Sequence, residues 1–555
     1  MNTRLIECVP NFSEGRDKQV IDTITSAISS VEGVKLLNVD PGAATNRTVV
    51  TFVGSPEAVV EAAFRAIRTA ASVIDMRIHH GEHPRIGATD VCPLIPVSGV
   101  TMEETVEYAR SLARRVGEEL GIPVYCYEKA ALSEIRSNLA VCRAGEYEGL
   151  AKKLRSPLWK PDFGPDDFSE NVAKTGLTVI GARDFLVAAN FNLNTTSVRR
   201  ANAIAFDVRE KGRKVIVDGQ EVVQPGSLKS CKAIGWFIEE YGFAQVSMNL
   251  TDISVTPLHV AFDEVCARAT ARGMRVTGTE LVGLVPKRTL LEAGRYFLHK
   301  QHRSLGLPEE EIIATAIRSM GLNELSPFNP REKVLEYLLE DEAPNKKKLI
   351  SLSCRSFAHE TASESPAPGG GSVSAYMGAL AASLGTMVAN LSSHKKGWDE
   401  RWEFFSDWAE KGQALVSELL FLVDEDTASF NRIMDAFSLP KSNEEEKAAR
   451  SAAIQEATLY ATRVPLQTMS AACKCFDIAD AMVQEGNPNS VSDAGVGALA
   501  ALAAVKGAYL NVRINAAGLK DKTVAASLSG KAEELLKEAV EKEMNIWKQV
   551  NEKIA

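Results

Sequence analysis

The sequence predicts a multidomain protein in which two α/β subdomains of the ferredoxin-like (split βαβ) type precede an all-α helical bundle. Three observations lead to this prediction. Short β-rich runs alternate with amphipathic helices in the first part of the chain, the same order restarts near residue 185, and Ala-rich helical sequence fills the chain beyond residue 349. The predicted parts are subdomains at 1–184 and 185–330, a linker at 331–348 and a helical domain at 349–555.

The elements of the first subdomain follow the order β-α-β-β-α-β. Its strands are expected at 5–9, 34–40, 48–53 and 91–97 and its helices at 17–31 and 56–74, with a further helix at 102–120 and a strand at 124–127. A Pro- and Gly-rich stretch at 159–165 then interrupts the pattern. In the second subdomain, strands are expected at 185–192, 232–238, 244–250 and 276–281, and helices at 197–211 and 257–271.

An acidic run, a breaker and a basic run mark the linker, in the order Glu340–Glu342, Ala343–Asn345 and Lys346–Lys348. Helices are expected beyond it at 349–362, 372–393, 398–435, 444–474, 492–516 and 523–553. The uncharged stretch between Glu364 and Lys395 carries its large apolar residues on one seam. A seam is typical of a bundle helix, so we expect no membrane insertion.

Composition narrows the class of protein. The chain has 555 residues, 45% hydrophobic and 24% charged, which is typical of globular proteins and excludes a mainly disordered or collagenous one. Its 63 Lys and Arg against 72 Asp and Glu give a net charge of −9, which disfavours nucleic-acid binding. Nine irregularly spaced cysteines without a C-x-x-C pair indicate reduced thiols, and the N-terminus has no signal-like apolar run. We expect a cytoplasmic protein.

Three of the eight histidines lie within five residues, at His79, His80 and His83. Gly81 and Pro84 exclude a helix there, so a metal site of the H-x-x-x-H type is not favoured, although a metal site and a purely structural loop remain alternatives. Histidine is the usual general acid or base near neutral pH. The cluster therefore predicts an acid/base histidine, and the neighbouring Arg85 suits a substrate that carries a carboxylate.

Other polar stretches have both a structural and a functional interpretation. The loop at 40–48 is either a plain hairpin or a site in which Asp40 supports a base and Arg47 contacts an anion. The stretch 226–235 holds two lysines, which are usually solvated on an edge strand but could receive an anionic group. The segment Pro368-Gly-Gly-Gly-Ser372 opens a helix, and its glycines serve either as a flexible cap or as an anion site. Ser492 or Asp493 suits an N-cap better than a site.

One carboxylate falls on an apolar helix face. Leu415, Leu419, Leu422, Ser429 and Ile433 form a seam, and Asp426 occupies the missing position in it, whereas Asp424 and Glu425 fall outside. Partial desolvation raises the pKa of a carboxyl group toward acid/base use, so Asp426 is a candidate catalytic acid. The alternative is a buried aspartate satisfied by a helix end or a serine.

Motifs in both halves of the sequence resemble known families. The N-terminal part resembles the glutamate formimidoyltransferase family in Glu7-Cys-Val-Pro-Asn-Phe-Ser-Glu-Gly15, Thr45-Asn-Arg-Thr48, His80-Gly-Glu-His-Pro-Arg85, Asp90-Val-Cys-Pro93 and Leu281-Val-Gly-Leu-Val-Pro286. The helical part resembles the cyclodeaminase/cyclohydrolase family in Ala367-Pro-Gly-Gly-Gly-Ser372, Asp424-Glu-Asp426 and Ser492-Asp493. The order and linker match the bifunctional formimidoyltransferase-cyclodeaminase family over essentially the whole chain.

The resemblance implies a folate enzyme of histidine degradation. It would transfer the formimidoyl group between N-formimidoyl-L-glutamate and tetrahydrofolate, a polyglutamylated co-substrate. It would then cyclise 5-formimidoyltetrahydrofolate to 5,10-methenyltetrahydrofolate with release of ammonia. The family's transferase histidine falls on His83 and its cyclodeaminase aspartate on Asp426. Its folate-binding stretches fall on Gly164, Pro165, Phe168, Gly226, Leu228, Lys229, Ile234 and Gly235. The family also implies a homo-oligomer built from dimers.

The expected chemistry needs no metal, because one histidine can move a proton from the attacking to the departing nitrogen. Asp40 would support that histidine, and Arg47 and Arg85 are candidates for binding a substrate carboxylate. Three alternatives remain: a transferase with a non-catalytic helical domain, a non-catalytic folate-binding protein, and a metal-dependent amidohydrolase at the histidine cluster.

Overall fold

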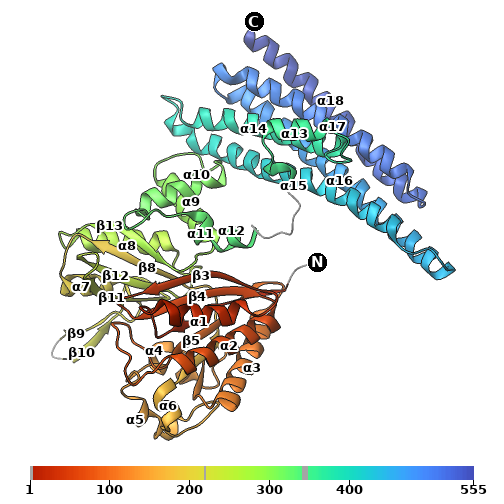
Figure 1. Ribbon diagram of the computed structural model, residues 1–555. Helices are drawn as coiled ribbons and strands as arrows, with labels where there is room; N and C mark the ends of the chain where they lie inside the picture. Colours follow the sequence, from red (N-terminus) through yellow and green to blue (C-terminus); the bar gives the residue numbers. More distant parts are fainter. Residues whose placement is uncertain (1–3, 218–219, 341–347) are drawn as a thin grey trace. The chain divides into compact units, whose positions relative to one another are not determined.

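The chain, described here by a computed structural model over residues 4–217, 220–340 and 348–555, forms two compact units (Figure 1). One unit is Met1–Ala293 with Ile317–Glu342, and the other is Gly294–Ala316 with Ala343–Ala555. We call them the α/β unit and the helical unit. Sheets with helices packed on them make up the first, and helices make up the second. The prediction of an α/β half followed by a helical half is confirmed.

The first sheet of the α/β unit has seven strands in the order β1-β4-β2-β5-β7-β6, with β3 paired to β4. The strands are β1 (Leu5–Cys8), β2 (Asn11–Phe12), β3 (Val34–Gly42), β4 (Arg47–Gly54), β5 (Thr89–Ser98), β6 (Val124–Glu128) and β7 (Thr178–Ala182). Its pairs are antiparallel except β5–β7 and β6–β7, which are parallel. The expected elements lack β7, whose β-branched run Thr178–Ile180 is interrupted by Gly181.

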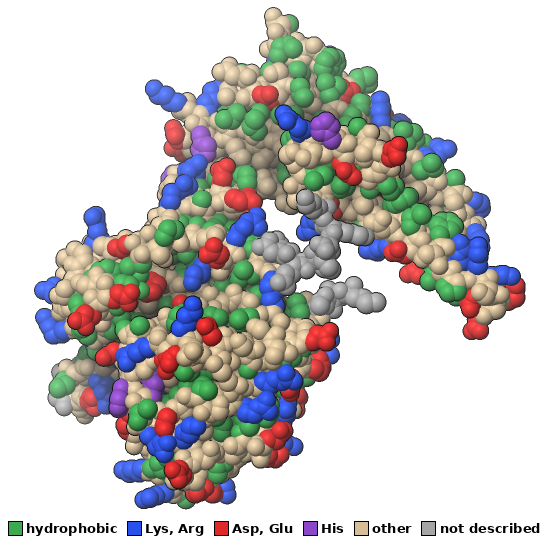
Figure 2. Space-filling model, viewed as in Figure 1, with side chains coloured by type: hydrophobic (Ala, Val, Ile, Leu, Met, Phe, Trp, Pro, Cys, Tyr) green, Lys and Arg blue, Asp and Glu red, His purple; other side chains and the backbone are tan. Residues whose placement is uncertain are grey.

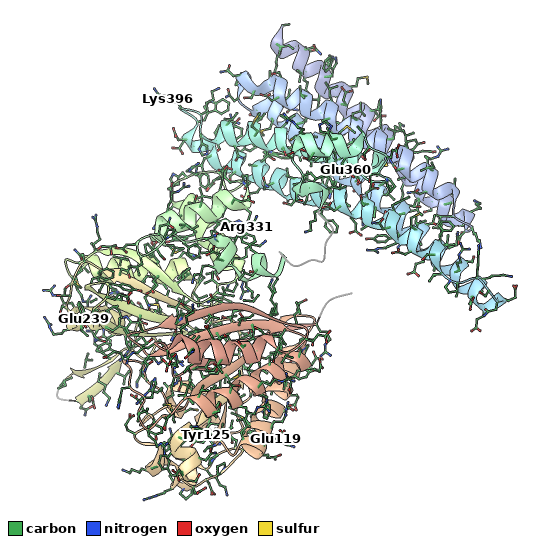
Figure 3. All side chains as sticks on the ribbon, viewed as in Figure 1. Glu119, Tyr125, Glu239, Arg331, Glu360 and Lys396 are labelled. Carbon is green, nitrogen blue, oxygen red and sulfur yellow. The ribbon has the colours of Figure 1, made fainter. Side chains whose placement is uncertain are left out.

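Amphipathic helices cover one face of this sheet: α1 (Lys18–Ser29), α2 (Pro56–Val73) and α3 (Met102–Leu120). Thr101 and Glu104 form a capping box at the start of α3, which is why this helix begins where the sequence predicts. The opposite face, near β6 and β7, packs against short helices: α4 (Leu139–Cys142), α5 (Leu150–Leu154) and α6 (Glu170–Thr175). Tyr125, labelled in Figure 3, is fully buried there.

A second, four-stranded antiparallel sheet follows in the order β11-β12-β8-β13. Its strands are β8 (Val187–Leu193), β11 (Cys231–Ile238), β12 (Phe243–Leu250) and β13 (Val276–Val282). Helices α7 (Val198–Val208) and α8 (Leu258–Thr270) pack against the sheet and each other. A separate hairpin, β9 (Arg213–Val217) with β10 (Gln220–Gln224), is an addition to the expected elements.

Four helices follow the second sheet: α9 (Lys287–Lys300), α10 (Glu309–Met320), α11 (Pro330–Lys333) and α12 (Leu335–Glu340). Residues 294–316 pack with the helical unit, where the Leu305 amide donates to Ser406 Oγ at 3.0 Å. The predicted boundary assigns this segment to 185–330, so the chain divides differently from the expected domains. Within the predicted linker 331–348, residues 335–340 are helical and belong to the α/β unit, whereas residues 341–347 lie outside the described residues.

The helical unit contains the short helix α13 (Cys354–Thr361) and a bundle of long helices: α14 (Gly370–Ser393), α15 (Trp402–Ser438), α16 (Glu444–Glu485), α17 (Val491–Ala517) and α18 (Lys522–Ile554). Alanine and glycine dominate the packed faces of α14 and α17, so these helices approach closely. For example, a Cβ on Gly378 would lie 2.9 Å from Leu419 Cδ2. Close packing of small residues therefore holds the core around α14.

In the part of the chain that the structure describes, two helices are long and apolar enough to cross a membrane by length and composition, Gly370–Ser393 and Pro488–Ala517. Within their most apolar windows, 61% and 44% of residues are buried inside the protein. The core helix of a bundle passes the same test. Figure 2 shows hydrophobic side chains spread over the visible face of the helical unit, and mixed acidic and basic side chains over the α/β unit.

Candidate functional sites in the two units

His83 lies in the loop between α2 and β5, where its ring is partly buried. Its Nδ1 is 2.7 Å from the carbonyl oxygen of Pro84. A carbonyl can only accept a hydrogen bond, so Nδ1 carries the proton and Nε2 keeps its lone pair. The loop therefore presents His83 in the tautomer that can accept a proton at Nε2.

A buried carboxylate with two arginines stands beside this histidine. Asp90 is fully buried and accepts from Arg47 and from both Nε and Nη2 of Arg143. It also accepts the Ile86 amide at 3.0 Å. Although burial opposes it, the charges of Arg143 and Arg47 lower the pKa of Asp90 to about 2. Asp90 is therefore ionised. Its single negative charge balances only one of the two positive charges of Arg47 and Arg143.

The same charges act on His83. Burial, followed by the positive charges of Arg47 and Arg143, lowers the pKa of His83 to about 3, against the opposing effect of Asp90. The imidazole is therefore neutral at physiological pH. The carboxylate that most affects the pKa of His83 is that of Asp90. Asp40, the residue predicted to support this histidine, is not among the main causes of the pKa shift.

Asp40 contacts a different part of the α/β unit. Its Oδ2 accepts the Gly283 amide at 3.1 Å, which ties β3 to the loop that follows β13. This contact joins the motif at 281–286 to the one at 40–48. Asp40 therefore holds together two parts of the unit in this structure.

Arg85 is buried and its donors are engaged. It donates to Glu148 at 2.7 and 2.9 Å, to Glu146 at 3.4 Å, and to the carbonyl oxygen of His79 at 3.0 Å. Its Nε also lies 3.4 Å from Nδ1 of His79, whose Nε2 contacts the Asn46 carbonyl. Arg85 lines a cavity of about 400 Å³ together with His80, Gly81, Gly145, Glu146 and Glu148. This arginine braces the loop and has little capacity left for a substrate.

The first predicted folate stretch lies after β6. Gly164 has a φ of +85°, and a Cβ there would meet the Ile122 carbonyl oxygen at 2.4 Å, so glycine is required by both conformation and space. Phe168 is 37% exposed, with its ring centroid 6.3 Å from that of Tyr147. Pro165 lies between these two positions and is partly buried. The stretch therefore combines a fixed turn with an accessible aromatic ring.

The second predicted folate stretch leads into the edge strand β11. Leu228 is buried, whereas Lys229 and Ile234 are exposed, and Gly235 donates its amide to Asn202 at 2.9 Å. A Cβ on Gly226 would collide with the Arg209 carbonyl oxygen at 2.0 Å. These glycines are therefore needed for packing.

One lysine of this stretch reaches the first sheet. Lys232 donates to Asn138 at 3.1 Å. Burial lowers its pKa, and the Arg143 charge acts in the same direction, against that of Glu128. The second sheet thus adds a cation to the group formed by Arg47, Arg143 and His83.

The helical unit brings two predicted motifs together around Asp426. Ser372, at the start of α14, donates from Oγ to Oδ2 of Asp426 on α15 at 2.9 Å. A Cβ on Gly371 would lie 2.1 Å from Oδ1 of the same carboxylate. Burial raises the pKa of Asp426, against the lowering effect of its hydrogen bonds with Ser372. Asp426 is thus a partly desolvated carboxyl group at a helix N-terminus.

The other acidic candidates lie apart from Asp426. Asp424 accepts the Leu349 amide at 2.6 Å, and burial raises its pKa. Ser492 and Asp493 lie in the first turn of α17. Gly497, one turn further along this helix, packs close to the carbonyl oxygen of Ala381 in α14. The opposite end of α17 lies near Asp426 instead, because Asn511 is close to Gly370. Asn511 was not expected as part of this site.

Among residues 4–217, 220–340 and 348–555, no group of three or more His, Cys, Asp or Glu side chains is arranged to hold a metal ion. Within the described residues, none of the nine cysteines forms a disulfide.

Three family descriptions match consecutive parts of the chain: the formiminotransferase domain, N-terminal subdomain, at 5–183, the formiminotransferase domain at 188–340, and formiminotransferase-cyclodeaminase at 353–534. A formimidoyltransferase-cyclodeaminase from Gallus gallus is 44% identical over 97% of both chains. The chain belongs to the formimidoyltransferase-cyclodeaminase family.

Shorter relatives match parts of this family member. A glutamate formimidoyltransferase from Thermoplasma acidophilum is 44% identical over 53% of this chain and 92% of its own. A methenyltetrahydrofolate cyclohydrolase from Methylorubrum extorquens is 39% identical over 36% of this chain and 95% of its own. Of the candidate site residues, His83 lies in the matched range 5–183, Lys232 in 188–340 and Asp426 in 353–534.

Proposed function

We propose that this protein is a bifunctional folate enzyme. The α/β unit transfers the formimidoyl group between N-formimidoyl-L-glutamate and tetrahydrofolate. The helical unit cyclises 5-formimidoyltetrahydrofolate to 5,10-methenyltetrahydrofolate and releases ammonia. The observation that carries the proposal is the 44% identity to a formimidoyltransferase-cyclodeaminase over 97% of both chains. Shorter relatives named for a transferase and for a cyclohydrolase support each activity separately.

His83 is the proton carrier of the transfer. N5 of tetrahydrofolate attacks the formimidoyl carbon, and Nε2 of His83 takes the proton that N5 loses. The bond between the formimidoyl carbon and the glutamate nitrogen then breaks, and His83 returns the proton to that nitrogen. The tautomer with hydrogen on Nδ1, set by the Pro84 carbonyl, supports this role.

Asp426 is the acid of the cyclisation. N10 attacks the formimidoyl carbon that N5 already holds, so positioning supplies much of the acceleration. The departing nitrogen gains two protons as it becomes ammonia, one from N10 and one from a general acid. The raised pKa of Asp426 supports its assignment as that acid.

One observation favours a second candidate, a transferase whose helical domain is not catalytic. Asp426 accepts a hydrogen bond from Ser372 at a helix N-terminus, which is also where a purely structural carboxylate is stable. The two functions differ in one measurable product. A structural Asp426 predicts glutamate release with accumulation of 5-formimidoyltetrahydrofolate and no methenyl product.

The finer features of the fold belong to the same proposal. The order β3-β4-β1-β5, with α1 and α2 among its covering helices, and the order β11-β12-β8-β13, with α7 and α8, support a ferredoxin-like fold for both sheets. The expected division into a transferase at 1–184 and 185–330, a linker at 331–348 and a cyclodeaminase at 349–555 is kept as the functional division. Residues 164–168 and 226–235 are proposed to contact a polyglutamylated tetrahydrofolate, with the accessible Phe168 and Ile234 as support.

Exposed apolar side chains on α14 and α17 support the expected homo-oligomer built from dimers. Leu391 is 49% exposed, Leu510 67% and Ile514 72%. Large exposed apolar groups on neighbouring helices are typical of protein interaction surfaces. Nine cysteines that form no disulfide within the described residues support the proposed cytoplasmic location.

Purified protein supplied with formimidoylglutamate and tetrahydrofolate tests the function directly. We expect glutamate release, ammonia release and the absorbance of 5,10-methenyltetrahydrofolate, in equal amounts once the steady state is reached. Omitting tetrahydrofolate should abolish all three signals. Binding of folate without any of these products would leave the non-catalytic folate-binding alternative, and retained hydrolysis without folate would leave the amidohydrolase alternative.

A further inference from the structure

Arg47, Asp90 and Arg143 form a buried group with unequal charge. The side chains of Arg47 and Arg143 are 10% and 14% exposed, and that of Asp90 is 0% exposed. Two guanidinium groups against one carboxylate leave one positive charge. Such a charge is costly in a poorly solvated place unless an anion balances it.

The donors of these arginines are only partly used. Arg47 donates Nε to Asn11 at 3.0 Å and Nη1 to Asp90. Arg143 donates Nε and Nη2 to Asp90. Among the described parts of the chain, neither Nη2 of Arg47 nor Nη1 of Arg143 has a hydrogen-bond partner, and both remain open to solvent. Two open donors on adjacent arginines match the two oxygens of a carboxylate.

The two arginines lie close to the loop that carries His83, because Asp90, to which both donate, also accepts the amide of Ile86, three residues after His83, at 3.0 Å. The charges of Arg47 and Arg143 are the two neighbouring charges that most affect this imidazole. In formimidoylglutamate, the α-carboxylate is separated from the formimidoyl carbon only by Cα and the glutamate nitrogen. An anion site beside His83 is therefore closer to what the α-carboxylate requires than to what the distant side-chain carboxylate requires.

We propose that the α-carboxylate of N-formimidoylglutamate binds between Nη2 of Arg47 and Nη1 of Arg143, so that Arg143 is a positioning residue for transfer. This inference rests on the proposed transferase function. It replaces Arg85 as a carboxylate ligand, because Arg85 already donates to Glu146, Glu148 and His79. Bound α-carboxylate balances the excess charge and fixes the formimidoyl carbon at Nε2 of His83.

The same contact links substrate binding to proton transfer. An anion between the arginines offsets the two positive charges that oppose protonation of His83. The histidine becomes a better base when the correct substrate has bound. A substrate without an α-carboxylate loses both positioning and this effect.

An enzyme–substrate double cycle tests the proposal. The full-length wild type and Arg143→Gln are compared with formimidoylglutamate and with N-formimidoyl-4-aminobutyrate, which keeps the side-chain carboxylate and lacks the α-carboxylate. For formimidoylglutamate, kcat/KM should fall about 10²-fold in the variant, a typical loss for a missing charged hydrogen-bond pair. For the analogue, the wild type and the variant should differ by less than about 3-fold, because the missing group has no partner to lose.

Controls separate a positioning role from a structural one. Arg155→Gln removes an exposed arginine from the nearby α5 C-terminus and should leave both kcat/KM values and the KM for tetrahydrofolate unchanged. If Arg143→Gln fails to fold, Arg143→Lys is used instead, because it keeps a positive charge beside Asp90 but lacks the several N–H donors of the guanidinium group. Inhibition by L-glutamate, the product with the same α-carboxylate, should then weaken about 10-fold.

Two outcomes would overturn the inference. Equal losses on the two substrates, or unchanged glutamate inhibition in Arg143→Lys, would mean that Arg143 only supports Asp90. Failure of the proposed function has a different signature: the wild type itself would release no glutamate in the presence of tetrahydrofolate. If the wild type releases glutamate but Arg143→Gln lowers kcat/KM equally for both substrates, the proposed function stands and only the contact between Arg143 and the α-carboxylate is refuted.

Discussion

Ser372 donates a 2.9 Å hydrogen bond to Asp426 across 54 residues of sequence and so joins the first turn of α14 to α15. The contact sets two effects against each other. Amides at a helix N-terminus favour a charged carboxylate, whereas burial favours the neutral acid. Burial is the larger effect, because the pKa of Asp426 is raised. The carboxyl group is therefore held in place by the helix start and keeps an elevated pKa.

Asp426→Asn should keep the shape of this contact and remove the transferable proton. We expect cyclodeamination to fall by ~10²-fold or more, the usual range for a lost general acid. Formimidoyl transfer should continue, so 5-formimidoyltetrahydrofolate should accumulate. Methenyl absorbance and ammonia release measured side by side with glutamate release check this.

The control for this substitution must come from the same helix. Asp424→Asn is unsuitable, because Asp424 accepts the Leu349 amide and its loss would loosen that segment. Asp435→Asn removes an exposed aspartate from α15 and should leave both activities within about 2-fold. An unfolded Asp426→Asn protein, or one that cyclises at the wild-type rate, would identify a structural carboxylate.

Gly371→Ala should displace the Asp426 carboxylate without changing its chemistry. The new Cβ would stand 2.1 Å from Oδ1, so either the side chain or the helix start must move. We expect cyclodeamination to fall at least 10-fold while transfer persists, because a misplaced group loses much of its catalytic effect.

Gly370→Ala is the matched control for that substitution. Its Cβ would make only an ordinary contact, 3.6 Å from Nδ2 of Asn511. Cyclodeamination should therefore survive in Gly370→Ala. Similar losses in both variants would show that the flexibility of the glycines, and not the Asp426 contact, is what the site needs.

The sequence predicts most elements because their signals are local. The helix at 102–120 has the predicted bounds, since Thr101 and Glu104 form a capping box that can be recognised from sequence alone. The seam that includes Asp426 is equally local, and it anticipates a carboxyl group of raised pKa. Residues 287–320 show the limit: α9 and α10 were not expected, and part of this segment packs with the helical unit.

Site residues brought together only by the tertiary fold were harder to find. Arg143 follows a helix of four residues, too short to give a periodic pattern, and its partner Asp90 is 53 residues away. Asn511 sits in a uniform small-residue helix and reaches Gly370 only because α17 packs beside α14. Asp90 itself lies in a motif that the sequence does single out, Asp90-Val-Cys-Pro93, so its importance could have been inferred without its partners.

His83→Ala should abolish formimidoyl transfer and change how stability depends on pH. Burial and the neighbouring arginines lower the pKa of His83 to about 3, below the value of about 6.5 expected in the unfolded chain. As pH falls from about 6.5 toward 3, the unfolded state binds a proton that the folded state does not, so the wild type loses stability. The variant lacks this loss, and its Tm relative to wild type should rise from pH 8 to pH 5.

His80→Ala is the control for both measurements, because His80 is exposed in the same loop. Transfer and the pH dependence of Tm should remain close to wild type. Cyclisation of supplied 5-formimidoyltetrahydrofolate should persist in both variants, because the Asp426 site lies in the helical unit. Wild-type transfer by His83→Ala would exclude this histidine as the proton carrier.

Gly306→Ala tests the assignment of residues 294–316 to the helical unit. A Cβ at Gly306 would lie 2.2 Å from the carbonyl carbon of Ala409 in α15, so backbone must move. We expect a loss of about 1–3 kcal/mol in the stability of the helical unit. Gly530→Ala in α18 has open space for its Cβ and should stabilise the helix by roughly 0.5–1 kcal/mol. Thermal unfolding of the full chain, together with the loss of cyclodeaminase activity on heating, should give a lower Tm for Gly306→Ala than for Gly530→Ala. Equal Tm values for the two variants would refute the packing of 294–316 on α15.

The last prediction concerns Glu7, a carboxyl group that is 4% exposed in β1. Burial raises its pKa to about 7. The charge of Arg183 opposes this shift, and the charge of Glu336 adds to it.

In the unfolded chain the pKa of Glu7 is about 4.3, so between these two pKa values the folded state holds a proton that the unfolded state has lost. The raised pKa therefore contributes stability that is fully present at low pH and is lost as pH rises through about 7. Glu7→Gln cannot ionise and should avoid a loss of about 4 kcal/mol above pH 8. The difference in Tm between the variant and wild type should thus increase from pH 5 to pH 8, whereas Glu118→Gln, at an exposed position in α3, should show no such change. A constant difference across this range would mean that Glu7 is ionised and paired in the folded protein.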